Sequence, residues 1–465
     1  MGVCVQTAPC CLGLGGGPDG RDVKVVAPDG CPRVSTSVAS TIKLLHMEFG
    51  AQIFVWWSFR LKWVEPRLLQ GALGKVLGSF PVFCGSIQGK VVKLTNAGVS
   101  FATLRSKEAT APYWHMKHGD PYGRAHIIIE HSSPMAVEMT CYQDGSAVLA
   151  IGFSHKVADG MTAWNFMNTW AETAQSQAMF SSHVQEVDVA EIMGTSKCDQ
   201  FGVDGRRARF NWAHEISRRT FPDLRTTVAF SHRELANLKA AIVQGMRKDA
   251  WITTQEALTA HLLSALGQVL YREPCRAGIC FVLDVRRLIG LPASYRSGAG
   301  IITFPVVVPG DLHALTLADV ADCLHRSLQG LTKEKARGMW ALREAAAKEP
   351  RRREFRGCRR DSAEDKTSTQ YLSRLVSHFC DCNLVIVVNN QGKMPVPDFG
   401  RAGGLAETLW SSSGGPGQVV VLPTTNGLAL HLGLLPGVLA RSRPARMKEV
   451  VQQLHKMPEC REFDI

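Results

Sequence analysis

The fold is constrained most by an alternation of strand-like and helix-like segments, which runs through both halves of this 465-residue chain. In the first half, apolar runs typical of strands lie at 53–57, 135–142 and 148–153, and helical spacing of apolar residues extends from Leu68 to Leu77. In the second half, similar runs lie at 279–284, 301–308, 384–388, 419–422 and 428–434. Strands and helices mixed in each half predict an α/β fold with α+β-type mixed sheets, built twice.

Turn and capping residues place the ends of several of these elements. Asp144-Gly145 and Asn426-Gly427 each separate two apolar runs, which predicts two β-hairpins. Helices of the second half are expected after residue pairs that can cap an N-terminus reciprocally, namely Ser231 with Glu234, Thr253 with Glu256 and Thr316 with Asp319.

The domain organisation follows from where these patterns begin and stop. Residues 1–35 are rich in Gly, Pro and Cys without lasting periodicity, so we expect a flexible tail. Residues 36–180 and 226–465 are expected to form two domains, joined by a crossover segment at 181–225. Six arginines at 351–360 are typical of a solvated loop, and a contact for phosphates is the alternative.

Composition limits the classes of protein that remain. No stretch reaches the ~18 apolar residues of a membrane span, so stable membrane insertion is not expected. The 14 cysteines lack the paired spacing of a disulfide framework or zinc site, which favours reduced thiols in the cytoplasm and no metal. A net charge of +12 suits a polyanionic partner, but no recognised nucleic-acid module or basic–aromatic interleaving accompanies it. We therefore expect no nucleic-acid partner.

The segment His155-Lys156-Val157-Ala158-Asp159-Gly160 carries the most specific chemical signal. The histidine lies at the end of a predicted strand, and the glycine opens a predicted helix, a position where binding crevices form in mixed sheets. Because a neutral imidazole is well populated near pH 7, His155 can take the proton of a hydroxyl or amine. Asp159 could orient that imidazole, or hold the loop by pairing with an arginine.

Several motifs resemble those of the BAHD acyltransferases, in the same order and spacing over about residues 40–455. They are His155 to Gly160 followed by Thr169-Trp170-Ala171-Glu172, Asp284-Val285-Arg286 at a strand end, Asp398-Phe399-Gly400 and the segment 68–87 with Phe80-Pro81 and Gly85. The family's D-F-G-W-G signature departs here at its last two positions, which are Arg401 and Ala402. Asp-Phe-Gly also occurs in protein kinases, but their glycine loop and H-R-D loop are absent from this sequence.

This resemblance implies two chloramphenicol-acetyltransferase-like domains with a solvent channel between them. An acyl-CoA co-substrate and a small-molecule alcohol or amine would meet at His155, without a further cofactor, in a monomeric cytoplasmic enzyme of secondary metabolism. It also implies that Asp159 points away from the substrate and pairs with Arg286. Structural rather than catalytic roles are implied for Asp284, Asp398, Phe399, Gly400 and Gly160.

One departure bears on the acceptor site. Where the family often has Thr-Ser-Trp, this chain has Asn389-Asn390-Gln391. A side-chain amide can donate a hydrogen bond to a developing oxyanion, so Asn389 and Asn390 are candidate substrate-binding residues, with a polar loop as the alternative.

Other functions stay open from the sequence alone. A condensation-type domain of the same superfamily usually carries another histidine before the catalytic one, where Ser154 stands here. A catalytically weak or non-catalytic binding protein that retains the fold is the alternative suggested by the altered Asp398 segment.

Overall fold

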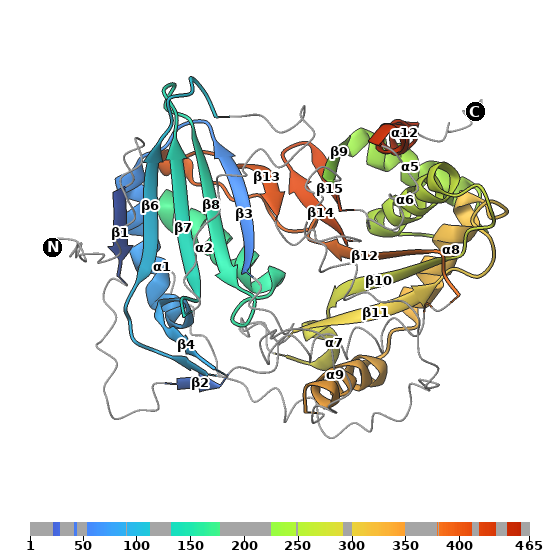
Figure 1. Cartoon of the computed structure of the whole chain (residues 1–465), viewed down its shortest axis with the longest axis horizontal. Coiled ribbons are helices and arrows are strands. Elements are labelled where there is room, and N and C mark those ends of the chain that lie inside the picture. The colour runs from blue at the N-terminus through green and yellow to red at the C-terminus, as the bar shows by residue number, and fades with distance from the viewer. Residues whose placement is uncertain are drawn as a thin grey trace, which may run out of the picture.

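The computed structural model describes residues 22–27, 41–43, 54–89, 91–111, 132–176, 225–247, 250–291, 300–348, 379, 381–411, 418–433 and 444–456. Within this part of the chain, two six-stranded sheets lie side by side, and a three-stranded sheet lies below the first of them (Figure 1). Each large sheet is accompanied by helices, so the predicted mixed α/β architecture, built twice, is confirmed.

The first sheet mixes parallel and antiparallel neighbours. Its order is β1 (Asp22–Val26), β6 (Val99–Arg105), β7 (Met135–Cys141), β8 (Ala147–Ser154), β3 (Phe54–Leu61) and β13 (Glu407–Ser411). The helices α1 (Pro66–Ser79) and α2 (Gly160–Ser176) accompany it, with the short 3₁₀ helix η1 (Pro81–Cys84). The small sheet has the order β2 (Thr41–Lys43), β5 (Val91–Lys93) and β4 (Ser86–Gln88).

The second sheet is also mixed. Its order is β11 (Ile301–Val307), β10 (Ala277–Asp284), β12 (Leu384–Asn390), β14 (Gln418–Thr424), β15 (Gly427–Gly433) and β9 (Arg225–Ser231). Its helices are α5 (His232–Gln244), α6 (Thr254–Leu270), α7 (Arg286–Ile289), α8 (Leu317–Gln329), α9 (Lys333–Lys348) and α12 (Pro444–His455). The three predicted capping pairs are confirmed at α5, α6 and α8, where both reciprocal hydrogen bonds form.

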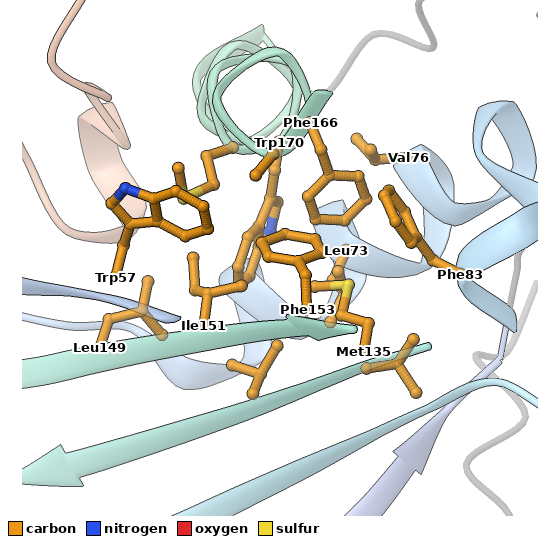
Figure 2. Close-up of a cluster of buried hydrophobic side chains, with 14 of the residues drawn as sticks. Trp57, Leu73, Val76, Phe83, Met135, Leu149, Ile151, Phe153, Phe166 and Trp170 are labelled. Atoms are coloured by element: carbon orange, nitrogen blue, oxygen red, sulfur yellow. The ribbon is translucent and has the colours of Figure 1, made fainter. Parts of the chain in front are cut away.

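Aromatic side chains fill the space between the first sheet and α2 (Figure 2). Phe153 of β8 packs edge-on against Phe166 of α2 at 5.7 Å between ring centroids, and Phe83 packs against the same Phe166 at 5.0 Å. Such pairs contribute about 0.5–1.5 kcal/mol each beyond their buried area. The strand that precedes His155 and the helix that follows Gly160 are therefore fixed against one another.

The second half of the chain also contributes to the first sheet. Strand β13 pairs antiparallel with β3, with Glu407 opposite Arg60. The 3₁₀ helix η6 (Gly400–Ala402) precedes β13, and the fully buried Phe399 belongs to the same apolar core as Trp170. Segments from late in the sequence thus add a strand and an aromatic side chain to the first sheet and its core.

Two expectations change at the ends of the predicted domains. Residues 22–26, which we expected to lie in a flexible tail, form β1 and pair with β6 from Asp22↔Thr103 to Val26↔Val99. An edge strand of five residues is too short to show periodicity, and it is stabilised by a partner distant in sequence. Residue 225, expected in the crossover segment, begins β9. Residues 181–224 and the arginine-rich segment 351–360 lie outside the described residues, and the domain limits stay a prediction.

The two predicted hairpins are confirmed. Their turn glycines allow a test of how closely β15 approaches β9. Gly427 has a φ of 149° in the β14–β15 turn, and a Cβ there would lie 1.9 Å from the carbonyl oxygen of Phe230 in β9. Gly145 has a φ of 83° in the β7–β8 turn, where a Cβ would meet nothing within 4 Å.

We expect Gly145→Ala to lower the free energy of unfolding by about 1–2 kcal/mol from backbone strain alone. Gly427→Ala should lower it by more than about 4 kcal/mol, measured by denaturant unfolding, because β9 must also move. Equal losses would contradict this close approach.

Candidate active site

His155 lies where a buried strand meets a helix, as the sequence predicted. All eight residues of β8 are buried, and the strand ends at Ser154 in the interior of the first sheet between β7 and β3. The backbone N–H groups of Val157 and Ala158 both donate to the carbonyl oxygen of Ser154, at 2.9 and 3.1 Å, which closes a tight turn. Val157 and Ala158 are buried, and the His155 side chain is half-buried. His155 thus lies in a turn that is held by backbone hydrogen bonds.

Asp159 ends this turn and caps α2. It is 1% exposed, and its Oδ1 accepts hydrogen bonds from the backbone N–H and the hydroxyl of Thr162, both at 2.9 Å. A carboxylate that accepts from the N3 amide is a favourable N-cap, because it satisfies an amide that has no partner inside the helix. Its other oxygen, Oδ2, lies 2.6 Å from Nη2 of Arg286.

Arg286 brings the second sheet into this network. Its Nη1 lies 3.0 Å from Oδ1 of Asp284, the last residue of β10, and the same oxygen accepts from the Arg286 backbone N–H. Gly300 gives the guanidinium room, since a Cβ there would lie 2.3 Å from Cζ of Arg286. The pairing of Asp159 with Arg286 is confirmed, and it joins α2 of the first sheet to β10 of the second.

Both members of this buried ion pair are charged at neutral pH. Burial alone would raise the pKa of Asp159, but the Arg286 charge and the hydrogen bonds from Thr162 and Arg286 outweigh it, so the pKa lies below its usual value. Burial likewise disfavours the charged form of Arg286, but Asp159 and Asp284 raise its pKa above the ordinary value. The Asp159 carboxylate and the Arg286 guanidinium therefore stabilise each other in their charged forms.

The Asp398-Phe399-Gly400 segment contacts the other end of α2. Gln175, near the C-terminus of this 17-residue helix, donates from its side chain to the carbonyl oxygen of Asp398, and Phe399 packs edge-on against Trp170. Asp398 accepts from the backbone N–H of Gly400, whose φ of 51° suits glycine. Since α2 spans about 25 Å, this segment and the His155 turn meet opposite ends of it.

Among Asn389, Asn390 and Gln391 at the end of β12, Gln391 makes the contacts between the two halves, although the sequence did not indicate it as a site residue. Asn389 and Asn390, the two candidates, are half-buried at the end of β12, and Asn390 Oδ1 accepts from the backbone N–H of Gly392. Gln391 is 4% exposed, and its Oε1 accepts from the indole N–H of Trp57 at 2.9 Å and of Trp164 at 2.8 Å. Its place directly after a buried strand was the only signal in the sequence.

The described residues contain no group of three or more His, Cys, Asp or Glu side chains arranged to hold a metal ion. Among the helices described, none combines the length and apolar character that a membrane crossing requires.

The ion pair predicts a strong and pH-dependent contribution to stability. We expect Asp159→Asn to lower the free energy of unfolding at pH 7 by about 3 kcal/mol, because it leaves a buried guanidinium facing a neutral amide. Since the folded pKa of Asp159 lies below the unfolded one, its contribution is full above about pH 4 and is lost as the pH falls through the folded value. The difference between wild type and variant should therefore shrink in acid, as measured by denaturant unfolding at a series of pH values.

Asp284→Asn is the matched control for this experiment. It removes the other carboxylate of the same arginine, but its side chain is 30% exposed, so the expected cost is about 1 kcal/mol or less. Equal costs for the two variants, or a difference independent of pH, would contradict the central role of Asp159.

Known proteins share both the sequence pattern and the fold. A sequence profile described as the Transferase family matches residues 62–351. An uncharacterized acetyltransferase of Arabidopsis thaliana is 24% identical over 274 residues, which cover 56% of this chain and 58% of that relative. The matched stretch thus spans less than two thirds of that relative.

Solved structures of low identity show the fold. Vinorine synthase superposes with a TM-score of 0.60 at 14% identity, over 92% of this chain and 97% of that one. TRI101 of F. graminearum, solved with coenzyme A and deoxynivalenol, superposes with a TM-score of 0.55 at 12% identity, over 88% of this chain and 98% of that one. The expected fold of two chloramphenicol-acetyltransferase-like domains is confirmed. Because the family profile covers more than half of its length, the chain belongs to the Transferase family, that of the BAHD acyltransferases.

Proposed function

We propose that this protein transfers an acyl group from an acyl-CoA to a hydroxyl or amine of a small molecule, with His155 as the general base. The observation that carries this proposal is the hydrogen-bonded turn that contains His155, between a buried strand and a helix anchored by the Asp159–Arg286 pair. A general base must be held in place to be efficient, and this turn is held from both sheets.

The proposed reaction has two steps and needs no oxidant or reductant. The neutral imidazole takes the proton of the acceptor hydroxyl or amine while the acceptor oxygen or nitrogen attacks the thioester carbonyl. The resulting tetrahedral intermediate collapses, the carbon–sulfur bond breaks, and the imidazolium returns its proton to the leaving thiolate of coenzyme A. The thioester is already activated, so transfer can be direct.

Four of the six free cysteines in the described part of the chain are poorly suited to act as a nucleophile. Burial raises the pKa of Cys275 and of Cys280 to about 12, and it also raises the pKa of Cys141 and of Cys323. A thiol needs a lowered pKa to act as a nucleophile at neutral pH. These four residues are therefore assigned to packing rather than to a covalent intermediate.

Asp159 is assigned a supporting role in this mechanism. Both of its carboxylate oxygens are engaged, one with Thr162 and the other with Arg286. The carboxylate thus fixes the end of the turn from which His155 projects. This favours the role in which Asp159 points away from the substrate over the role in which it orients the imidazole.

The substrates are proposed as classes. Coenzyme A bound to the structurally similar TRI101 supports an acyl-CoA co-substrate here. In this proposal, donor and acceptor enter a channel between the domains from opposite faces. Phenols, terpenoid alcohols, sugars and polyamines are the acceptor classes to be tested. We also propose that the protein is a cytosolic, monomeric enzyme of secondary metabolism.

The proposal predicts that His155→Ala lowers turnover by about 10²–10⁴-fold, the usual contribution of a general base. The measurement is release of free thiol from acetyl-, malonyl-, hydroxycinnamoyl- and long-chain acyl-CoA against a panel of alcohols and amines. His313→Ala is the matched control, because it removes an exposed imidazole on the second half of the chain. Turnover by His155→Ala close to that of His313→Ala would remove His155 from the mechanism.

The same assay separates transfer from the alternative of a binding protein that retains the fold. The replaced residues of the Asp398 segment motivate that alternative, since Arg401 and Ala402 stand where the family has Trp and Gly. Thiol release that requires an acceptor supports the transferase. Binding of coenzyme A in calorimetric titration, without release from any donor, would favour the binding protein.

A further inference from the structure

The side chain of Gln391 crosses from the second sheet to the first. Its backbone N–H donates to the carbonyl oxygen of Val421 in β14 at 2.8 Å, so its main chain belongs to the second sheet. Its side chain reaches Trp57 of β3 and Trp164 of α2, which belong to the first. Together with Asp159 and Arg286, this residue makes a second buried polar link between the two halves.

The amide oxygen of Gln391 serves two donors at once. Trp57 and Trp164 are 1% and 0% exposed, and their rings meet edge to face at 6.4 Å between centroids. The oxygen accepts from both indoles where they converge. An amide oxygen has two lone pairs, so glutamine is a neutral side chain that satisfies both buried N–H groups. The two bonds also fix which end of the amide is oxygen.

The amide nitrogen then lies against the start of α2. A Cβ on Gly160 would be 3.3 Å from Gln391 Nε2, so the absence of a side chain at Gly160 leaves room for the amide. Gln391 therefore lies beside the first residue of α2 and is hydrogen-bonded to Trp164, one turn later. The Asp159–Arg286 pair holds the residue just before, which means that the first turn of α2 is held to the second sheet at two neighbouring points.

We propose that Gln391 is a positioning residue for His155, a role that rests on the proposed acyl transfer. The His155 turn has two ends: β8 fixes one through the first sheet, and the first turn of α2 fixes the other. A clamp on that turn sets the direction of the imidazole relative to groups of the second sheet. Displacements of about 1 Å at a distance from the chemistry can lower a rate by 10²-fold.

Gln391→Met tests the clamp, because it keeps a side chain of similar length but offers no oxygen to the two indoles. We expect kcat to fall by about 10–10²-fold. The KM for the acyl-CoA should change little, since Gln391 acts through His155 rather than on the donor. Unchanged kcat in this variant would overturn the proposal.

Gln391→Glu is the conservative rescue. A carboxylate can accept from both indoles, and the N-terminal turn of α2 favours a negative charge. We expect its kcat to recover by about tenfold over that of Gln391→Met. Equal loss in the two variants would overturn the clamp and assign the effect to the amide nitrogen, which glutamate lacks.

Two further measurements separate this role from general destabilisation and from failure of the proposed function. Leu324→Ala, a buried change in the second core, should lower the melting temperature without changing kcat. In protein labelled with ¹⁵N-tryptophan, the indole signals of Trp57 and Trp164 should shift in Gln391→Met and return in Gln391→Glu, which requires no turnover. Unshifted signals would overturn the clamp. Absence of turnover in the wild type would remove the proposed function and the positioning role, while the signals would still report the two hydrogen bonds.

Discussion

The buried ion pair between Asp159 and Arg286 is the contact on which the arrangement of the candidate site depends. It joins the turn that carries His155 to the end of β10 in the other sheet, at 2.6 Å. Removing two charges from water is costly, and buried pairs often add little net stability. Their value here is geometric, because the bond between Asp159 and Arg286 forms only when the two halves of the molecule are placed correctly relative to each other. Thr162 and Asp284 complete the network and fix its orientation.

The halves are joined by more than this pair. Gln391 reaches back from the second sheet to two buried indoles, and β13 adds a strand from late in the sequence to the edge of the first sheet. Phe399 enters the aromatic core from the segment just before β13. α2 is therefore held at its first turn by the ion pair and Gln391, and near its last turn by the Asp398 segment. A helix held at both ends presents the preceding turn in one orientation.

These contacts explain how the Asp398 segment still packs against α2, although Arg401 and Ala402 differ from the family signature. Phe399 remains fully buried against Trp170, and Gly400 keeps the left-handed conformation that the turn needs. Arg401 is exposed, and Ala402 is small enough to be buried. The two departures from the family signature thus fall where the turn itself does not depend on them, and they lie at the end of α2 opposite His155.

The sequence by itself determined the elements whose signals are local. Apolar runs located β8 and β12, the three capping pairs located α5, α6 and α8, and glycine located both hairpins, because strand burial, caps and turns depend on neighbours within a few residues. The position of His155 between strand and helix followed from the same signals, and the partnership of Asp159 with Arg286 from the family resemblance. Only the tertiary structure decided that β1 and β13 join the first sheet and that Gln391, rather than Asn389 or Asn390, bridges the halves. Those features depend on partners 73 residues away (Val26 with Val99) to 354 residues away (Trp57 with Ser411), and Trp57 lies 334 residues from Gln391. No local pattern encodes such distances.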